Sequence, residues 1–139
     1  MRFLKLAALA VSSLCVFAAI TAFNATTCFA EGESYTFFCG DTSKNCRIVT
    51  AERGAAVCGL LLDDVCGEST TYSSLDVENF LDSVNGEVLF CEELSDSVNL
   101  YCSADLPYSV TLYGEEVNLH ICIKQDSVTV ASPIIFGGY

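Results

Sequence analysis

Residues 116–124 have the sequence EVNLHICIK, in which apolar and polar side chains alternate from Val117 onward. Successive side chains of a β-strand point to opposite faces of its sheet, so this stretch predicts a strand with two unlike faces. One face holds the apolar side chains Val117, Leu119, Ile121 and Ile123. The other face holds Asn118, His120, Cys122 and Lys124. Such a strand is typical of an antiparallel sheet with one face on a core and one polar face toward solvent.

Three further segments near this strand have the same period of two, namely residues 87–94, 98–106 and 127–136. The dipeptide Tyr113-Gly114 marks a turn between the second of them and residues 116–124. In residues 98–106 the side chains expected to face the core are Val98, Leu100, Cys102 and Ala104. Because Cys102 and Cys122 then lie on opposite faces of the sheet, we expect no disulfide between them.

Before these strands the period lengthens to that of a helix. Asp76 is a suitable N-cap, and the apolar side chains after it fall on one helical face, at Val77, Phe80, Leu81 and Val84. Leu75 can pack on Phe80 across the cap, and Gly86 suits the C-terminal end. The sequence predicts an amphipathic helix over residues 76–85.

The first half of the body predicts a hairpin and a less regular region. Residues 35–39 and 46–50 are rich in β-branched and aromatic side chains and flank a polar turn, which is typical of a hairpin. Within residues 52–72 we expect one strand or helix over residues 55–65, followed by a polar turn at residues 67–74. The expected fold is α+β: a single small domain in which an antiparallel meander sheet carries one well-defined amphipathic helix packed on one face.

The first thirty residues have the layout of a secretory signal peptide. A short cationic start with Arg2 and Lys5 precedes an apolar run from residue 6 to residue 23. Cleavage after Ala30 would leave a body of residues 31–139. Two alternatives remain open: an uncleaved membrane anchor, and a lipid on Cys28. In each case the body lies outside the cytoplasm, secreted or tethered through the N-terminal segment.

The charge of the body excludes several kinds of partner. Residues 31–139 hold four basic side chains against eighteen acidic ones, a net charge of −14. Nucleic-acid binding requires basic side chains that neutralise phosphates, and docking on anionic lipids requires a similar cluster. We therefore expect no nucleic acid as a partner, and no membrane insertion of the body unless the N-terminal segment is retained.

The body contains seven cysteines, a density typical of exported disulfide proteins. The odd number leaves at least one thiol free or bonded to another chain. Cys39 and Cys46 flank the hairpin turn and are the candidate disulfide pair, while a protein with few or no disulfides remains the alternative. No closely spaced cysteine pair accompanies the single histidine, so we expect neither a metal site nor any other cofactor.

Candidate catalytic residues are few. His120 is the only histidine, and it shares a strand face with Cys122, which makes these two the weak candidates for a cysteine-dependent reaction. Binding candidates are the tyrosines of the strand region, Tyr101, Tyr108 and Tyr113, which can line a groove for a sugar or a peptide.

The C-terminal part of the chain resembles a known family. Residues 114–119, with the sequence GEEVNL, and residues 132–135, with the sequence SPII leading to Tyr139, are similar to the YwmB-like family of exported proteins from Gram-positive bacteria. That resemblance implies an exported α+β body with a fold similar to the saddle of the TATA-box-binding protein. The function of that family is unknown, so the resemblance implies no reaction.

These observations favour a small exported accessory protein of the cell envelope or extracellular space. We expect a non-catalytic role in which one sheet face binds an unknown protein or envelope polymer. The alternative is a thiol-redox or cysteine-dependent enzyme that uses a free cysteine near His120.

Overall fold

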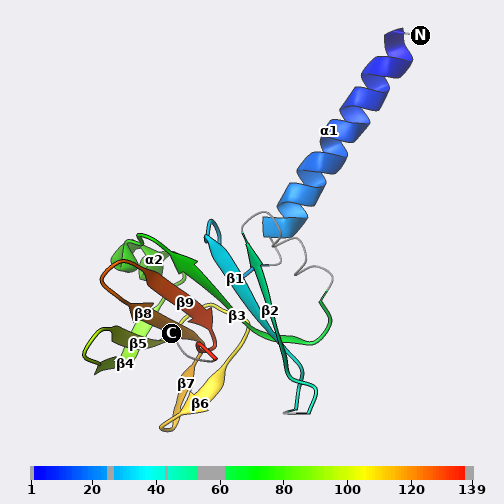
Figure 1. Cartoon of the computed structure of the whole chain (residues 1–139). Helices are drawn as coiled ribbons and strands as arrows, with labels where there is room; N and C mark the ends of the chain where they lie inside the picture. Colours follow the sequence, from blue (N-terminus) through cyan, green and yellow to red (C-terminus); the bar gives the residue numbers. More distant parts are fainter. Residues whose placement is uncertain (1, 25–26, 43, 53–61, 137–139) are drawn as a thin grey trace.

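The computed structural model describes residues 2–24, 27–42, 44–52 and 62–136 of the chain (Figure 1). In chain order its elements are α1 (Arg2–Asn24), β1 (Ser34–Cys39), β2 (Arg47–Glu52), β3 (Val65–Tyr72), α2 (Val77–Ser83), β4 (Glu87–Glu93), β5 (Val98–Ser103), β6 (Val110–Leu112), β7 (Glu115–Val117), β8 (Leu119–Ile123) and β9 (Val128–Ser132). The residues expected to form a strand or helix over 55–65 lie mostly outside the described residues.

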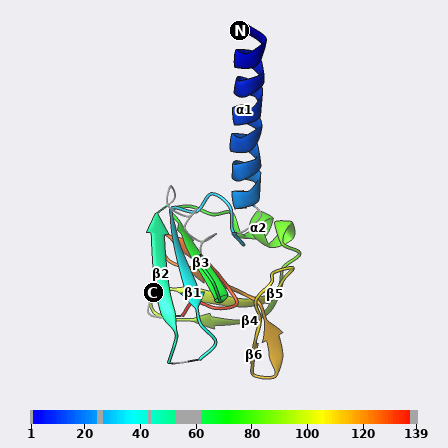
Figure 2. The same ribbon diagram turned by 90° about the vertical axis from the view of Figure 1, so that its right-hand side faces the viewer.

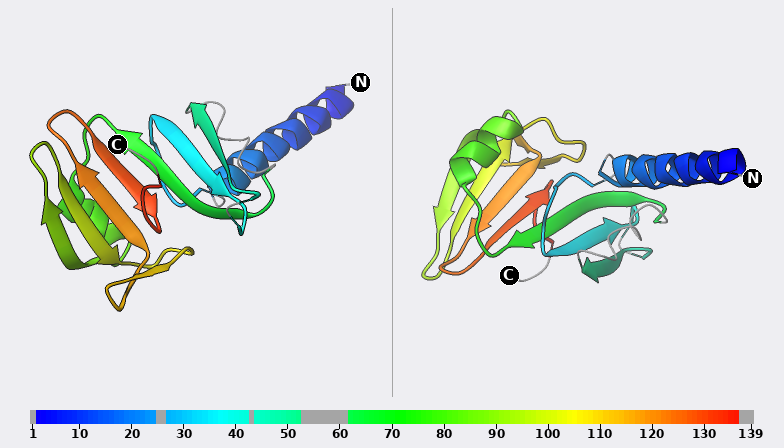
Figure 3. Two further views of the ribbon diagram at one scale, coloured as in Figure 1. Left: turned by 60° about the horizontal axis from the view of Figure 1, so that its bottom comes forward. Right: turned by 90° about the horizontal axis from the view of Figure 1, so that it is seen from above.

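Seven strands form one antiparallel sheet in the order β2-β1-β3-β9-β8-β5-β4, and β6 and β7 form a separate two-stranded hairpin. Helix α2 lies against the half of the sheet that contains β8 and β5 (Figure 3). The hairpin of β6 and β7 projects from the sheet, and α1 extends away from it (Figures 1 and 2). The predicted α+β class is confirmed.

The core lies between α2 and one face of the sheet, as the alternation in residues 98–106 and 116–124 predicts. Leu119 and Ile121 of β8 are completely buried there, and Leu100 and Cys102 of β5 pack beside them. Cys102 and Cys122 lie on opposite faces, as expected, and each is a free thiol in the structure.

The second face of the sheet is buried around His120, which corrects the expectation of a polar face toward solvent. Asn99, His120 and Cys122 are 0%, 2% and 1% exposed. The reason is the segment after β9, which turns back over this face so that the backbone amide of Ile135 reaches the His120 ring. Alternation predicts which side chains share a face, but it does not predict what covers that face.

Helix α2 begins and ends close to the predicted positions. The Asp76 carboxylate accepts a hydrogen bond from the Asn79 amide at 3.1 Å, which caps the first turn. At the other end Asn85 takes the left-handed conformation with φ 50°, and the Gly86 amide donates to the Leu81 carbonyl at 2.7 Å. The helix therefore ends with a Schellman-type hydrogen bond in which asparagine, not the predicted glycine, supplies the left-handed residue.

The predicted polar turn at residues 67–74 is wrong, because most of it is strand β3. This strand lies inside the sheet between β1 and β9, so its backbone groups are paired on both sides. Both threonines of this strand form side-chain hydrogen bonds: the Thr70 hydroxyl donates to the Ser34 carbonyl at 2.6 Å, and the Thr71 and Thr129 hydroxyls are 3.1 Å apart. β-Branched residues favour strands even where the segment is polar.

The folded body includes residues before the expected boundary at Ala30. The Phe29 side chain is 1% exposed and belongs to the same core cluster as Leu119 and Ile121. The Tyr35 hydroxyl donates to the Phe29 carbonyl at 3.1 Å, and the Tyr72 hydroxyl donates to the Ala30 carbonyl at 2.7 Å. Residues 28–30 therefore pack with the body in the structure, and the boundary expected after Ala30 stays a prediction. In the described part of the chain, no helix meets the length and hydrophobicity that crossing a membrane requires.

Replacement of Phe29 by alanine tests the contribution of this residue to the core. We expect Phe29→Ala to lower the free energy of unfolding of the uncleaved chain by about 3–5 kcal/mol, because it opens a cavity among packed side chains. Urea unfolding followed by circular dichroism measures the change. The control is Phe17→Ala, the same change at a side chain that is 65% exposed in α1. Equal effects of the two substitutions would contradict the assignment of Phe29 to the core.

Candidate functional site

The most suggestive cavity lies on the sheet face opposite α2 and has a volume of about 570 Å³. We call it the aromatic groove. Its lining residues come from β4, β5, β8, the hairpin of β6 and β7, and the segment after β9: Phe90, Cys91, Glu92, Tyr101, Thr111, Leu112, Tyr113, His120, Ile134 and Ile135.

Three of these rings form a ladder across neighbouring strands. Phe90 is the register partner of Tyr101, and Tyr101 is the register partner of His120. The Phe90 and Tyr101 rings stack with centroids 4.7 Å apart, and the Tyr101 and His120 rings stack at 4.5 Å. Tyr113 adds an edge-on contact to Phe90 at 5.7 Å. Cross-strand ring pairs of this kind stabilise a sheet and hold its side chains in fixed positions.

His120 is buried and engaged at both ring nitrogens. Its Nδ1 accepts a hydrogen bond from the Ile135 amide at 3.2 Å, and its Nε2 lies 3.0 Å from Asn99 Oδ1. An acceptor Nδ1 requires that the proton of the neutral ring be on Nε2, which then donates to Asn99. Burial lowers the pKa of His120 to about 4, so the ring is neutral at physiological pH.

The pair His120 and Cys122 does not form a nucleophile with a general base. Both ring nitrogens hold other partners, and the Cys122 thiol makes its side-chain hydrogen bond with Ser97. Burial also raises the pKa of Cys122, which disfavours the reactive thiolate. His120 is instead a buried ring hydrogen-bonded to Asn99 of the adjacent strand β5.

Tyr113 is the most exposed aromatic side chain of the groove, at 95%. It occupies the turn between β6 and β7 with φ 53°, and Gly114 follows with φ 88°. Two positive φ values are typical of a type I′ turn, in which asparagine is far commoner than tyrosine at the first position. Strain of this kind is retained most often where the side chain has a function.

The structure brings together two of the three predicted tyrosines. Tyr101 and Tyr113 both line the aromatic groove, whereas Tyr108 does not. The Tyr108 carbonyl accepts a hydrogen bond from the Ser132 hydroxyl at 3.3 Å, and Ser132 is the register partner of Glu68 in β3. Burial, with the nearby charges of Cys28 and Glu68, raises the pKa of Tyr108. Phe90 also lines the groove and is not among the predicted binding residues. Its place in a predicted strand next to residues 98–106 indicates that it can lie beside Tyr101.

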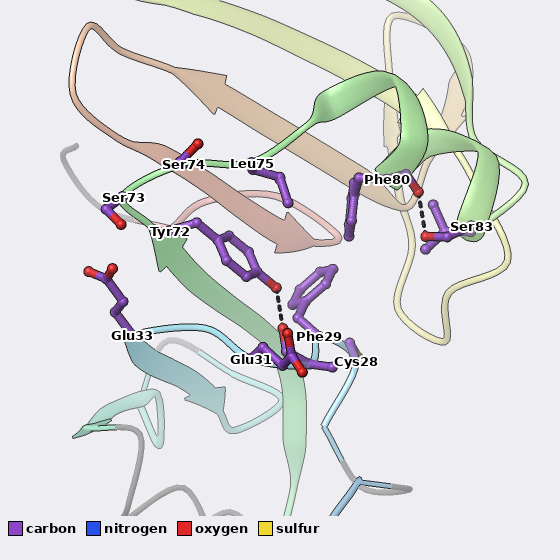
Figure 4. Close-up of a pocket in the computed structure, with 12 residues that line it drawn as sticks. Cys28, Phe29, Glu31, Glu33, Tyr72, Ser73, Ser74, Leu75, Phe80 and Ser83 are labelled. Carbon is purple, nitrogen blue, oxygen red and sulfur yellow. Dashed lines mark hydrogen bonds between the residues drawn. The ribbon is translucent and has the colours of Figure 1, made fainter.

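A second cavity, of about 500 Å³, lies between α2 and the segment that leads into β1. Figure 4 shows the Phe29 ring facing Phe80 there, and the Tyr72 hydroxyl directed at the backbone of the entering segment. Because Phe29 and Ala30 form part of its wall, this cavity depends on residues at the start of the body.

The described side chains form neither a metal site nor the candidate disulfide. Among the described residues, no three His, Cys, Asp or Glu side chains are arranged to hold a metal ion. Cys39 is a buried free thiol and Cys46 an exposed free thiol, so the structure does not contain the candidate disulfide between them. That pairing stays a prediction for oxidising conditions.

No protein-family model, curated protein or solved structure matches the chain. The resemblance to the YwmB-like family therefore stays a prediction.

The single histidine allows a direct test of the groove floor. We expect the His120 ring signals to remain constant as the pH falls from 8 to 5 and to titrate near pH 4, because the buried ring resists protonation. Between pH 6.5 and pH 4 the unfolded chain binds a proton that the folded chain does not. This group alone therefore lowers the free energy of unfolding by up to about 3 kcal/mol as the pH falls through that interval.

NMR titration of the imidazole protons measures this pKa without any assignment problem. The same titration in urea is the control and should give the ordinary value near 6.5. A folded-state transition near pH 6.5 would show that the ring is open to water.

Proposed function

We propose that the protein is an exported, non-catalytic binding protein that takes an apolar or aromatic anchor of a basic partner protein into the aromatic groove. The observation that carries the proposal is Tyr113, an aromatic side chain held in solvent at a strained turn beside the ring ladder. Export is supported by the pattern of the first thirty residues and by the resemblance to the YwmB-like family.

The lining of the groove favours an apolar anchor. Phe90, Tyr101 and Leu112 provide apolar surface on one side, and Ile134 and Ile135 provide it on the other. Aromatic side chains in partly enclosed pockets are enriched among residues that dominate protein–protein binding energy. The volume of about 570 Å³ is sufficient for one or two large side chains.

The charge of the body favours a basic partner. Glu92 is the only charged side chain among the described residues that line the groove, and the neutral state of His120 adds no positive charge. Residues 31–139 carry a net charge of −14, which attracts basic surfaces and repels anionic polymers. An anchor flanked by lysine or arginine therefore fits better than an acidic or phosphate-rich polymer.

The alternative of a cysteine-dependent enzyme has weaker support. Cys91 is an exposed free thiol that lines the groove, but the ring nitrogens of His120 are hydrogen-bonded elsewhere. No arrangement of described residues gives Cys91 an activating base.

Replacement of Tyr113 by asparagine separates binding from stability. Asparagine before glycine is the preferred type I′ turn, so we expect Tyr113→Asn to raise the free energy of unfolding by about 0.5–1 kcal/mol. Because the anchor loses its aromatic contact, we expect binding to weaken at least about tenfold, or about 1.4 kcal/mol. Peptides selected from a random display library provide the ligands, and calorimetry measures their affinity.

Two controls make this experiment decisive. Tyr113→Phe keeps the ring and should retain affinity, and Ile48→Ala changes an exposed apolar side chain in β2, away from the groove, and should also retain it. We expect the selected peptides to share a large apolar residue flanked by lysine or arginine. Selection of acidic peptides, or binding only to neutral oligosaccharides tested in parallel, would contradict the proposed partner class.

A further inference from the structure

Glu68 is a buried carboxyl group that the aromatic groove does not explain. Its side chain is 1% exposed in β3, and burial raises its pKa. Oε2 accepts a hydrogen bond from the Cys28 amide at 2.9 Å, and the Cys28 thiol and the Phe29 amide also interact with the carboxylate. Oε1 has no hydrogen-bond partner among the described residues. A buried carboxyl with one unpaired oxygen is costly unless a positive charge or further donors approach it.

We infer that the mature protein begins at Cys28, with its α-ammonium group bound by the buried carboxylate of Glu68. This inference rests on the export that the proposed function includes. It assigns the processing site to the Thr27–Cys28 bond in place of the bond after Ala30, and it assigns to Glu68 the recognition of the new chain end.

The nitrogen of Cys28 already lies in the position that this interaction requires. As a peptide amide it offers Glu68 one N–H, at 2.9 Å from Oε2. As an ammonium group it would offer three N–H donors and a positive charge, enough to reach Oε1 as well. Charge-assisted hydrogen bonds are shorter and stronger than neutral ones, and a buried carboxylate is stable only when it is paired.

Cleavage after Ala30 would remove the groups that hold the start of the body in place. It would take away the buried Phe29 ring and the carbonyl groups that accept hydrogen bonds from Tyr35 and Tyr72. It would also remove the Cys28 amide and leave Glu68 buried without that donor. Cleavage before Cys28 preserves all of these contacts.

The sequence before Cys28 is compatible with this processing site. Ala25 and Thr27 are the small residues at the third and first positions before the bond, the positions at which signal peptidases require small side chains. The reaction is a hydrolysis. One water molecule adds across the Thr27–Cys28 peptide bond, which gives a carboxylate on Thr27 and an ammonium group on Cys28.

The test is the intact mass of the exported protein, reduced and alkylated, from cells that express the full chain. We expect the mass of residues 28–139 without a lipid. Exported protein that starts at Glu31 or upstream of Cys28, or that carries a lipid, overturns the inference and leaves the groove proposal standing. Retention of the uncleaved chain inside the cell overturns both. A Cys28 start with no peptide binding overturns only the groove proposal.

The role of Glu68 is tested by the reactivity of the new N-terminal cysteine. 2-Cyanobenzothiazole condenses with an N-terminal cysteine: the thiolate adds to the nitrile, and the deprotonated amine then closes the ring with loss of ammonia. Glu68 acts on the thiol as well, so each condensation rate is divided by the rate at which iodoacetamide alkylates the Cys28 thiol of the same protein. We expect this ratio to be at least about tenfold lower for folded mature protein than for the Glu68→Gln variant, because the carboxylate keeps the amine protonated. Both proteins should give the same ratio in urea. Equal ratios in the folded state would overturn the assigned pairing, and the mass measurement on the wild-type protein does not depend on how the variant folds.

Discussion

The hydrogen bond from the Ile135 amide to Nδ1 of His120 is the contact on which the second face of the sheet depends. It holds the segment after β9 across strand β8 and fixes the proton of the ring on Nε2, which then bonds Asn99. The neutral, fixed imidazole is also the last ring of the ladder that includes Tyr101 and Phe90. This one hydrogen bond therefore fixes two parts of the aromatic groove, the ring ladder that ends at His120 and the segment that contains Ile135.

Regular alternation and helix capping were sufficient to predict much of the C-terminal half. The faces of residues 98–106 and 119–123, the helix near residues 76–85 and the turn at Tyr113-Gly114 follow from local patterns, and the structure confirms them. The single strand expected over residues 116–124 is wrong, because the chain divides at Asn118 into β7 of the hairpin and β8 of the main sheet. Strand β3 did not follow, because its polar side chains satisfy their hydrogen bonds with partners distant in the sequence. The strand propensity of a segment does not predict which distant residues will accept its hydrogen bonds.

The sequence predicts that tyrosines line the site, but it does not predict which of them do. Tyr101 and Tyr113 meet in the groove because β5 and the hairpin of β6 and β7 lie side by side, whereas Tyr108 precedes that hairpin and lies near Glu68. The spacing of these tyrosines along the chain predicts neither of these two positions. The same is true of the buried state of His120, which depends on a segment fifteen residues later.

Strand β8 explains why both ends of the described body are needed for one fold. Phe29 packs in the core on the face that holds Leu119 and Ile121, while Ile135 covers the opposite face at His120. Apolar side chains of a central strand are stabilised when they are buried, and polar groups that are buried with them need hydrogen-bond partners. Because the two segments that complete this burial are among the first and last described residues of the body, a boundary drawn inside either one removes part of the core or part of the groove. A boundary at the bond after Ala30 would separate Phe29 from the core that it fills in the structure, and hydropathy along the chain does not show that contact.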